Sequence, residues 1–452
     1  MKLLLLLNSP PYLRPFADTM QTLADRGHQI SIGWHSPSAK GPVAAVDQLA
    51  AHPNITFVPV PVKRSEQRYA VNLLRRTRNY VRYLETPFRG AGKLRRRAFD
   101  RLLRGALADD TVVDSALSDS GLALPVSDVA RIKEALAWME TLIPPDPACT
   151  ALVADGGYDA VLVSSLVALN SSTQVEVVKA ARNLGVPVGL LVYSWDNLST
   201  KGEIHAMPDK VFTWNQRQRD EATELHNVPP ARVVMAGAPR FDEFLACAPQ
   251  VPRQRFFETM GLDPKRPALM YLCSSAFVSG DEIPFITRWL RALRTAPSED
   301  VRNCNVIVRP HPDVALIGKD VPGTKLDLGV DDLAATAFRP FDDPGAVVVR
   351  TASRTPQGLY ECLWHSDAVV GLNTSAEIEA GLLGRPVFSV LAGSAADGQQ
   401  SSLHFHYLLT EQGGFVEVGE SFERHVEQVH ALLALPPDER EDRRRAVASR
   451  AI

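Results

Sequence analysis

Short and continuous apolar runs recur along the chain, and segments with helical periodicity separate them. A strand that is covered by helices on both faces is apolar on both sides, so continuous runs predict strands of parallel sheets. Lys2–Leu7 and Gln29–Trp34 are the first two such runs, and a helix is predicted between them at Pro15–Asp25. The alternation predicts an α/β protein built from doubly wound sheets.

Two series of this kind follow one another. The other predicted strands are Phe57–Val62, Ala160–Ser164, Val186–Tyr193, Lys210–Trp214 and Arg232–Ala236 in the first series, and Ala268–Cys273, Asn305–Val308, Ala346–Val349, Ala368–Gly371 and Val387–Val390 in the second. A proline-rich polar stretch separates the two series. We therefore expect two Rossmann-like domains at 1–236 and 266–452, a hinge at 237–265, and a helical insert at about 63–145 in the first domain.

Composition limits the class of protein. Hydrophobic residues make up 45% of the 452 residues, charged residues make up 22%, and the net charge is −3, which suits a globular chain without nucleic-acid partners. The apolar opening Leu3–Leu7 is far shorter than the ~20 residues of a membrane span, so a buried strand is expected there and no signal peptide. Five scattered cysteines without a Cys-x-x-Cys pair favour reduced thiols and a cytoplasmic location.

The strongest motif is Arg309-Pro310-His311-Pro312-Asp313, directly after a predicted strand. The prolines prevent a helix and fix the backbone at the carboxyl end of that strand, where doubly wound sheets bind ligands. A guanidinium beside an imidazole suits a phosphate or a diphosphate, so we predict that Arg309 binds phosphate and that His311 is catalytic. A rigid turn with a solvated histidine is the alternative.

A second candidate is Asn373–Glu379, which follows the strand Ala368–Gly371. Thr374 or Ser375 stands where a helix should begin, and a helix start is a ready anion site. We predict that both residues bind the phosphates of a nucleotide and that Glu379, one turn further, binds the ribose of that nucleotide. An ordinary helix cap that binds nothing is the alternative.

A third candidate, Ser194–Gly202, follows the strand Val186–Tyr193. Asp196 is predicted as a general base. Trp195, Asn197 and Lys201 are predicted to contact a substrate that accepts the transferred group, or to line a ligand-binding cleft between the two domains. In that cleft Lys201 would meet a phosphate. An Asx-turn is the alternative.

Weaker candidates complete the set of site residues. Ser274 and Ser275 are predicted to bind the phosphates of the nucleotide. Arg240, His404 and His406 are predicted to line the ligand-binding cleft. No carboxylate or cysteine stands at ligand spacing from the two histidines, and the Asp-Asp pairs lack the Asp-x-Asp form, so no metal is expected. No Gly-x-Gly-x-x-Gly follows the first strand and no Walker loop is present, so no cofactor is expected either.

With these motifs the chain resembles the GT-B glycosyltransferase superfamily over nearly its whole length. Arg309-Pro310-His311-Pro312 is similar to the His-Pro motif of bacterial CDP-glycerol glycerophosphotransferases, Kdo transferases and polysialyltransferases, which implies that His311 contacts the donor phosphate. Asn373–Glu379 resembles a segment of UDP-N-acetylglucosamine 2-epimerases of the same fold, which assigns Thr374 and Ser375 to phosphate and Glu379 to ribose. Asn373 and Ser375 replace the acid and the glycine of that segment. The paired glutamates of many retaining transferases are also absent.

Together, the residues and the resemblance lead to a metal-independent glycosyltransferase. It would move a sugar from a nucleotide-sugar donor, which is a substrate and not a cofactor, to a cell-surface glycan or a lipid-linked acceptor. The alternatives are a polyol-phosphate transferase that uses a CDP-polyol, a nucleotide-sugar 2-epimerase, and a membrane- or glycan-associated scaffold without activity.

The predicted insert begins with a strongly basic segment. Residues 63–104 hold 14 lysines and arginines against three acidic residues, a net charge of +11, and tyrosine and phenylalanine side chains are interleaved with them. Contact with anionic lipid at the inner face of the cytoplasmic membrane, or with a phosphorylated acceptor, is expected. The alternative is that the arginine side chains pack on the first domain and pair with its acidic residues.

Overall fold

The computed structural model describes residues 1–36, 44–61, 68–106, 114–169, 172–275, 278, 282–311, 322–330, 333, 335–351, 356–391, 399 and 401–451. Lys63–Gln67 of the basic segment and Pro312-Asp313 of the histidine motif lie outside these residues. The chain forms two compact units, Met1–Arg240 and Phe241–Ile452, which are described separately below. The hinge predicted at 237–265 stays a prediction.

Unit 1 is built on a seven-stranded parallel sheet in the order β3-β2-β1-β4-β5-β6-β7. The strands are β1 (Lys2–Leu7), β2 (Gln29–Trp34), β3 (Ile55–Phe57), β4 (Ala160–Val163), β5 (Val188–Leu191), β6 (Lys210–Thr213) and β7 (Val233–Met235). This order is that of a Rossmann fold, and it reverses direction between β1 and β4.

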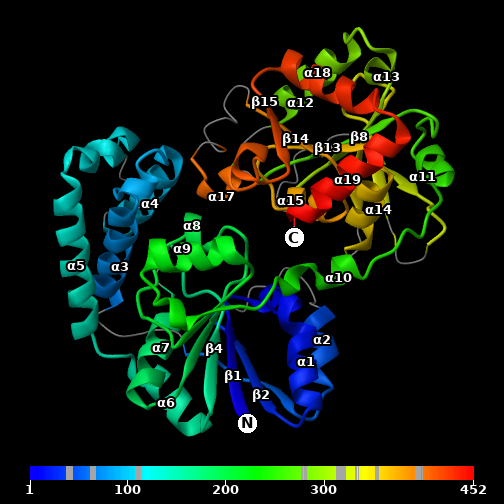
Figure 1. Ribbon diagram of the computed structural model, residues 1–452. Helices are drawn as coiled ribbons and strands as arrows, with labels where there is room; N and C mark the ends of the chain where they lie inside the picture. Colours follow the sequence, from blue (N-terminus) through cyan, green and yellow to red (C-terminus); the bar gives the residue numbers. More distant parts are fainter. Residues whose placement is uncertain are drawn as a thin grey trace. The chain divides into compact units, whose positions relative to one another are not determined.

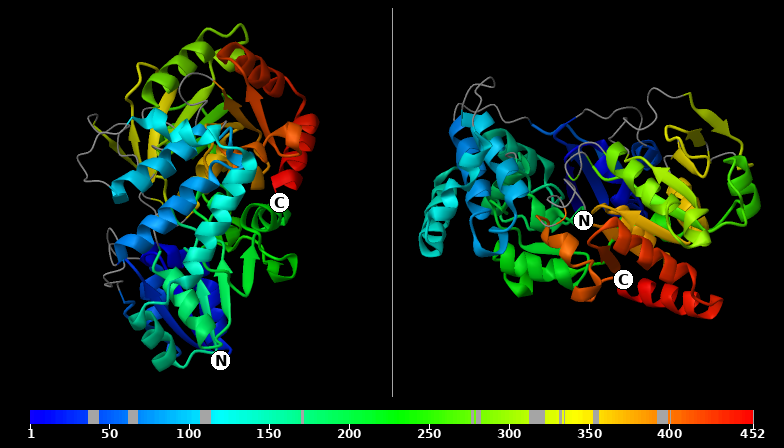
Figure 2. Two further views of the ribbon diagram at one scale, coloured as in Figure 1. Left: turned by 90° about the vertical axis from the view of Figure 1, so that its left-hand side faces the viewer. Right: turned by 90° about the horizontal axis from the view of Figure 1, so that it is seen from above.

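The helices of unit 1 follow the strands and cover the sheet (Figure 1). They are α1 (Ala17–Asp25), α2 (Ala44–Ala50), α3 (Arg68–Arg82), α4 (Gly92–Ala106), α5 (Val126–Leu142), α6 (Pro147–Gly156), α7 (Gln174–Asn183), α8 (Asn197–Thr200) and α9 (Gln216–His226), with 3₁₀ turns at Pro10–Phe16, Thr86–Phe88, Ser115–Ala123, Pro230–Arg232 and Pro239–Phe241. Helices α3, α4 and α5 form a bundle beside the sheet (Figures 1 and 2).

The first strand shows why an uninterrupted apolar run is needed. Leu4 and Leu6 pack into a core cluster on one face of the sheet, whereas Leu3, Leu5 and Leu7 pack into a second cluster on the other face. Successive side chains of a strand point to opposite faces, so a strand covered on both sides needs apolar residues at every position. Five consecutive leucines meet this requirement.

The third strand differs from its prediction. It was predicted at Phe57–Val62, but β3 spans Ile55–Phe57. Proline has no N–H to donate to a sheet ladder. Pro59 and Pro61 therefore end the pairing early, and the strand boundary moves toward the N-terminus.

Unit 2 has an eight-stranded sheet in the order β10-β11-β12-β9-β8-β13-β14-β15. The strands are β8 (Ala268–Leu272), β9 (Asn305–Arg309), β10 (Thr324–Leu326), β11 (Ala335–Phe338), β12 (Ala346–Thr351), β13 (Ala368–Gly371), β14 (Val387–Val390) and β15 (Val416–Gly419). Six strands are parallel, and β10 and β11 add an antiparallel edge that we did not predict. The parallel part reverses its order between β8 and β13.

The helices of unit 2 lie around this sheet (Figure 1). They are α10 (Asp242–Leu245), α11 (Arg253–Thr259), α12 (Ile283–Arg294), α13 (Glu299–Arg302), α14 (Gln357–His365), α15 (Ala376–Leu382), α17 (Leu403–His406), α18 (Phe422–Leu433) and α19 (Pro437–Ala451), with a 3₁₀ turn at Thr410–Gln412. Trp289 of α12 and Tyr271 of β8 are fully buried in one core cluster with aliphatic side chains of the parallel strands. The prediction of two Rossmann-like parallel sheets flanked by helices is confirmed.

Candidate functional site

The sheet of unit 2 brings three predicted segments to one edge. The pairing of β8 places Leu272 beside both Arg309 of β9 and Gly371 of β13. The residues that follow these strands are Cys273–Ser275, Arg309–His311 and Leu372–Glu379, which we call the unit 2 edge. Open α/β sheets bind ligands where the strand order reverses, and in unit 2 this point lies between β8 and β13.

The turn after β8 is closed by a buried glutamate. The Glu282 carboxylate accepts hydrogen bonds from the Ser274 main-chain N–H, at 3.1 and 3.2 Å, and from the Ser274 hydroxyl. Burial raises the pKa of Glu282 above its ordinary value, and the bonds from Ser274 oppose the rise. The Ser274 groups that we predicted to bind phosphate are therefore already engaged by a carboxylate.

A second buried glutamate closes the turn after β13. The Oε1 atom of Glu377 accepts the main-chain N–H groups of Asn373, at 2.9 Å, and Thr374, at 3.3 Å. A side chain at Gly371 would place its Cβ 2.3 Å from the same oxygen, so only glycine leaves room for this contact. Complete burial raises the pKa of Glu377 from 4.5 to about 8, and the nearby charge of Glu282 adds to the rise.

These contacts change the expected roles of Asn373–Glu379. Helix α15 begins after Ser375, as predicted, but neither Thr374 nor Ser375 is found to cap it with its side chain. Ser375 is exposed and Glu379 is half-buried, so both are accessible, whereas Glu377 is the buried acid of the segment. We did not predict Glu282 or Glu377. The position of Glu377 one residue after the helix start was the available signal.

Arg309 and His311 occupy the end of β9. Arg309 donates from Nη2 to the Thr351 hydroxyl at 3.0 Å and from Nη1 to the Gly358 carbonyl at 3.4 Å, so part of its guanidinium holds β9 to β12 and α14. His311 is half-buried. Burial raises the pKa of the Cys273 thiol, and a hydrogen bond from the main-chain N–H of His311 opposes this rise. His311 thus lies at the end of β9, beside the turn that follows β8.

The pKa of Glu377 predicts a pH dependence of stability. The unfolded state ionises at its ordinary pKa of 4.5 while the folded state holds the proton up to about pH 8. This group therefore destabilises the fold progressively as the pH rises from 4.5 to 8. Glu377→Gln keeps an acceptor for the two N–H groups and removes the ionisation. We expect the variant to gain stability over the parent by on the order of 2–4 kcal/mol between pH 5 and pH 8.

Urea unfolding of both proteins across this pH range measures the effect. The exposed Glu411→Gln in the same unit serves as the control, because its difference from the parent should not change with pH. A constant difference for Glu377→Gln as well would contradict the assignment.

In unit 1, the segment Ser194–Gly202 is held by its own polar side chains and by α9. Asn197 accepts the main-chain N–H groups of Tyr193, at 3.1 Å, and Ser194, at 2.9 Å. The Gln218 amide of α9 donates to the carbonyls of Ser194 and Trp195 at 3.2 and 3.3 Å. Asn197 therefore has the turn-forming role that we weighed as the alternative for this segment.

The basic insert holds the same segment from the other side. Arg82 of α3 is fully buried and donates to the carbonyls of Leu198, Lys201 and Gly202. The Tyr83 hydroxyl donates to the Lys201 carbonyl at 2.8 Å. Two consecutive residues of the insert thus fix the backbone around α8.

Asp196 lies in this rigid frame with its carboxylate partly exposed. Its Oδ2 atom accepts the Thr200 hydroxyl at 2.8 Å and forms an ion pair with the Lys201 ammonium at 2.9 Å. Burial lowers the pKa of Arg97 of α4, and the negative charge of the nearby Asp196 opposes this change. The arrangement provides a carboxylate held in one orientation next to two cations.

The remaining predicted residues are spread over both units. Trp195 is buried. Arg240 lies near Tyr193: burial raises the pKa of Tyr193, and the positive charge of Arg240 opposes this rise. His404 is buried and His406 is half-buried, both on α17. In the described part of the chain, no group of three or more histidine, cysteine, aspartate or glutamate side chains is arranged to hold a metal ion.

Comparison with known proteins gives structural matches only. No family model and no curated protein sequence matches the chain. Among solved structures, a Listeria monocytogenes protein assigned as a UDP-N-acetylglucosamine 2-epimerase has a TM-score of 0.52 at 10% identity, covering 99% of this chain and 90% of its own. MnaA of S. aureus with UDP has a TM-score of 0.51 at 10% identity (100% and 92%). The UDP-GlcNAc 2-epimerase of Neisseria meningitidis bound to UDP-GlcNAc has a TM-score of 0.50 at 13% identity (100% and 97%).

These matches extend over nearly the whole length of every chain compared. Together with two Rossmann-like units, they show that the protein has the GT-B fold. The GT-B-like fold predicted from the sequence is confirmed. At about 10% identity the likeness concerns the fold, so the reaction has to be argued from the residues of the two sites.

Proposed function

We propose that the protein is a metal-independent glycosyltransferase that moves a sugar from a nucleotide-sugar donor to a glycan or lipid-linked acceptor. One observation carries the proposal: in a GT-B fold, the carboxyl edge around the reversal point between β8 and β13 carries His311, which follows β9, and Asn373–Glu379, which follow β13. The S. aureus and N. meningitidis structures that share the fold contain UDP and UDP-GlcNAc, which supports a nucleotide-linked ligand.

In this proposal the unit 2 edge binds the donor. His311 donates a hydrogen bond to the diphosphate, and Thr374 and Ser375 at the start of α15 supply further donors. Glu379 binds the ribose hydroxyls. Glu377 is mostly protonated at neutral pH because its pKa is about 8, so its buried carboxyl does not repel the phosphates. Positive charge and hydrogen-bond donors around the leaving diphosphate take the place of a metal.

Asp196 of unit 1 accepts the proton of the acceptor hydroxyl. The hydroxyl oxygen then forms a bond to the anomeric carbon of the sugar, the bond from that carbon to the phosphate oxygen breaks, and its electron pair leaves with the nucleoside diphosphate. Lys201 keeps the Asp196 carboxylate oriented through its ion pair. A positioned base of this kind contributes ~10²–10⁴ in rate.

A 2-epimerase is the second candidate for a specific reason. Epimerisation requires several acid and base groups around the sugar, and the unit 2 edge holds two carboxyl groups, Glu282 and Glu377, that we did not expect from the sequence. Both are engaged with main-chain N–H groups of their own turns, which favours a structural role for them and keeps the transferase as the first proposal. A polyol-phosphate transferase that uses a CDP-polyol would employ the same diphosphate contacts.

Thermal unfolding in the presence of CMP-, CDP-, UDP- and GDP-sugars tests the donor site. We expect one nucleotide class to stabilise the protein, and we expect His311→Ala to remove most of that stabilisation. The exposed His430→Ala on α18 is the matched control and should retain it. If no nucleotide sugar stabilises the parent, or if His311→Ala responds like the parent, the donor assignment is wrong.

The reaction type is tested with the stabilising donor. A transferase releases nucleoside diphosphate faster when a glycan or lipid-linked acceptor is present, and an epimerase converts the donor sugar without any acceptor. A CDP-polyol as the only stabilising donor would identify the polyol-phosphate transferase.

The membrane contact predicted for the basic segment stays a prediction, and part of the charge of this segment is used inside unit 1. Of its arginines, Arg75, Arg78, Arg82 and Arg95 are buried and bonded within unit 1. No helix in the described part of the chain is long and apolar enough to cross a membrane. Helix α5, by contrast, exposes large apolar side chains: Val126, Ile132, Trp138, Met139 and Leu142.

We propose that the side of α5 that carries Ile132, Trp138, Met139 and Leu142 contacts an anionic bilayer, with exposed Arg131 on the same side and Arg101 and Arg104 exposed on α4. Vesicles that contain phosphatidylglycerol should shift the emission of Trp138 to the blue and should sediment the protein at low salt. Trp138→Ser should weaken binding several-fold, whereas the exposed Leu184→Ser at the end of α7 should not. Equal binding of both variants, or none by the parent, would contradict the contact.

A further inference from the structure

A cavity of about 530 Å³ lies within unit 2, at the opposite edge of the sheet from His311. It is lined by Pro249, Gln250, Val251, Pro252, Arg253, Trp364, His365, Asp367, Arg385 and Arg444. Asp367 and Arg385 precede β13 and β14, so they belong to the amino ends of these strands, whereas the unit 2 edge is formed by the carboxyl ends. None of the residues assigned to the donor or the acceptor lines this cavity.

Two guanidinium groups, those of Arg253 and Arg444, share the Asp367 carboxylate in the cavity wall, and Arg444 also lies 3.8 Å from Glu441. Asp367 accepts the main-chain N–H of Ala268 at 2.9 Å and one N–H of Arg253 at 3.4 Å, and its other oxygen lies 4.0 Å from Arg444. Arg253 is otherwise bonded to main-chain carbonyls, including that of His365 at 2.5 Å. The lining therefore carries an excess of positive charge that Asp367 does not neutralise.

Arg385 is the least compensated of the three arginines that line the cavity. It is 5% exposed, and its Nη1 atom donates to the Ser366 carbonyl at 3.1 Å, while its buried Nε–H has no hydrogen-bond acceptor among the described residues. No carboxylate of the described chain forms an ion pair with it. Burial, together with the charges of Arg444 and Arg253, lowers the pKa of Arg385 from 12.5 to about 10, and the charge of Asp367 opposes this change only in part.

The aromatic wall keeps this guanidinium in place. Arg385 lies 5.4 Å from the centre of the Trp364 ring, and Trp364 stacks on Tyr360 with an angle of 9° between the planes. Trp364 is 39% exposed and lines the cavity, so its emission reports on events at this place. The side chain that carries the uncompensated charge is thus held before any ligand arrives.

We propose that this cavity is a second ligand site of the protein, which binds the diphosphate group of a small anion through Arg385, Arg444 and Arg253. Guanidinium groups present paired N–H donors that match phosphate oxygens, and three of them line this cavity. Arg253 adds its charge, because most of its N–H groups are bonded to main-chain carbonyls, and Arg385 and Arg444 supply the donors. A volume of this size holds a small molecule, not a polymer. The ligand is either free diphosphate or a nucleoside diphosphate, which offer the same group.

The test uses the full chain and the emission of Trp364, taken as the difference between the parent and Trp364→Phe. Pyrophosphate and UDP are titrated in separate experiments. We expect a saturable change with at least one probe, and we expect Arg444→Gln to weaken binding by about tenfold or more, because one charge-assisted contact is lost. Arg444 is one-third exposed on the terminal helix, so this substitution leaves the core intact.

Two controls separate this site from other effects. Arg255→Gln on α11 removes an exposed arginine that does not line the cavity and should bind both probes like the parent. His311→Ala removes the proposed donor contact and should leave the Trp364 response unchanged, so failure of the donor site and failure of this site are distinguishable. Arg385→Lys keeps a positive charge but loses the paired donors, and we expect weaker binding.

Tighter binding of UDP than of pyrophosphate would identify a nucleoside diphosphate as the ligand, and the reverse would identify the free anion. Either result, with the loss in Arg444→Gln, supports the site. The proposal is overturned if neither probe changes the emission of Trp364, or if Arg444→Gln binds within twofold of the parent.

Discussion

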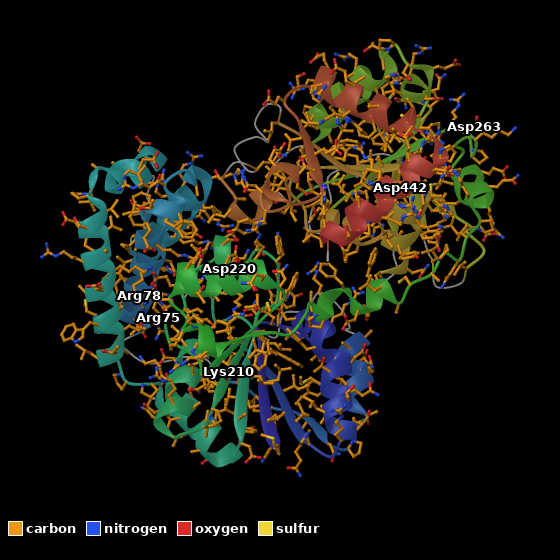
Figure 3. The ribbon with its side chains drawn as sticks, in the orientation of Figure 1. Arg75, Arg78, Lys210, Asp220, Asp263 and Asp442 are labelled. Carbon is orange, nitrogen blue, oxygen red and sulfur yellow. The ribbon has the colours of Figure 1, made fainter. Side chains whose placement is uncertain are left out.

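Replacement of Arg75 by methionine is expected to destabilise unit 1 by about 3–5 kcal/mol. Arg75 of α3 is labelled in Figure 3 and is fully buried. It donates to Glu140 of α5 at 2.6 and 3.0 Å and to Glu176 of α7 at 2.6 Å. Methionine fills a similar volume but carries no charge, so two carboxylates would remain buried with Lys179 as their nearest cation, 3.1 Å from Glu140. Breaking a buried ion pair from one side is costly because the other charge stays behind.

Chemical unfolding, combined with hydrogen exchange of the peptides from α3 and α5, measures this loss in unit 1. Arg101→Met makes the same replacement at an exposed position of the insert and should change stability by less than about 0.5 kcal/mol. Adding Glu140→Gln and Glu176→Gln to Arg75→Met should recover much of the loss, since the stranded charges are then absent. A triple variant as unstable as the single one would show that the volume of Arg75, not its charge, holds the insert.

Asp196→Asn is expected to lower kcat by ~10²–10⁴ while donor binding stays the same. Asparagine has the size of aspartate and still accepts the Thr200 hydroxyl bond, so the turn around α8 is preserved. It cannot take the proton of an acceptor hydroxyl. The lost ion pair with Lys201 is about one-third exposed, so its contribution to stability is only about 0–1 kcal/mol.

Lys201→Met separates the two roles of Asp196. This variant breaks the same ion pair but leaves the carboxylate, so a modest loss of kcat is expected and not the loss seen with Asp196→Asn. Equal kinetics of the two variants would mean that Asp196 acts only by holding Lys201. Unchanged kinetics in Asp196→Asn would make it a turn residue.

The buried apolar runs of the sequence were sufficient to predict two parallel α/β units. Leu3–Leu7 of β1 are all apolar because both faces are covered, and this pattern needs no knowledge of distant residues. With the exception of β3, the strand ends followed from the same runs to within two residues, and with them the positions of Asp196, His311 and Asn373–Glu379 after the carboxyl ends of strands. Short and partly solvated strands at or next to a sheet edge have weaker patterns, which is why β10, β11 and β15 were missed.

The order of the strands and the partners of the charged residues were decided by the tertiary structure. Arg75 meets Glu140 and Glu176, which are 65 and 101 residues away along the chain, so a count of arginines could not tell which of them the fold would bury in ion pairs. Glu282 and Glu377 likewise became recognisable only when the pairing of β8 with β13 placed their two turns side by side. Burial and long-range pairing set the charge state of a side chain, and neither is a property of local sequence.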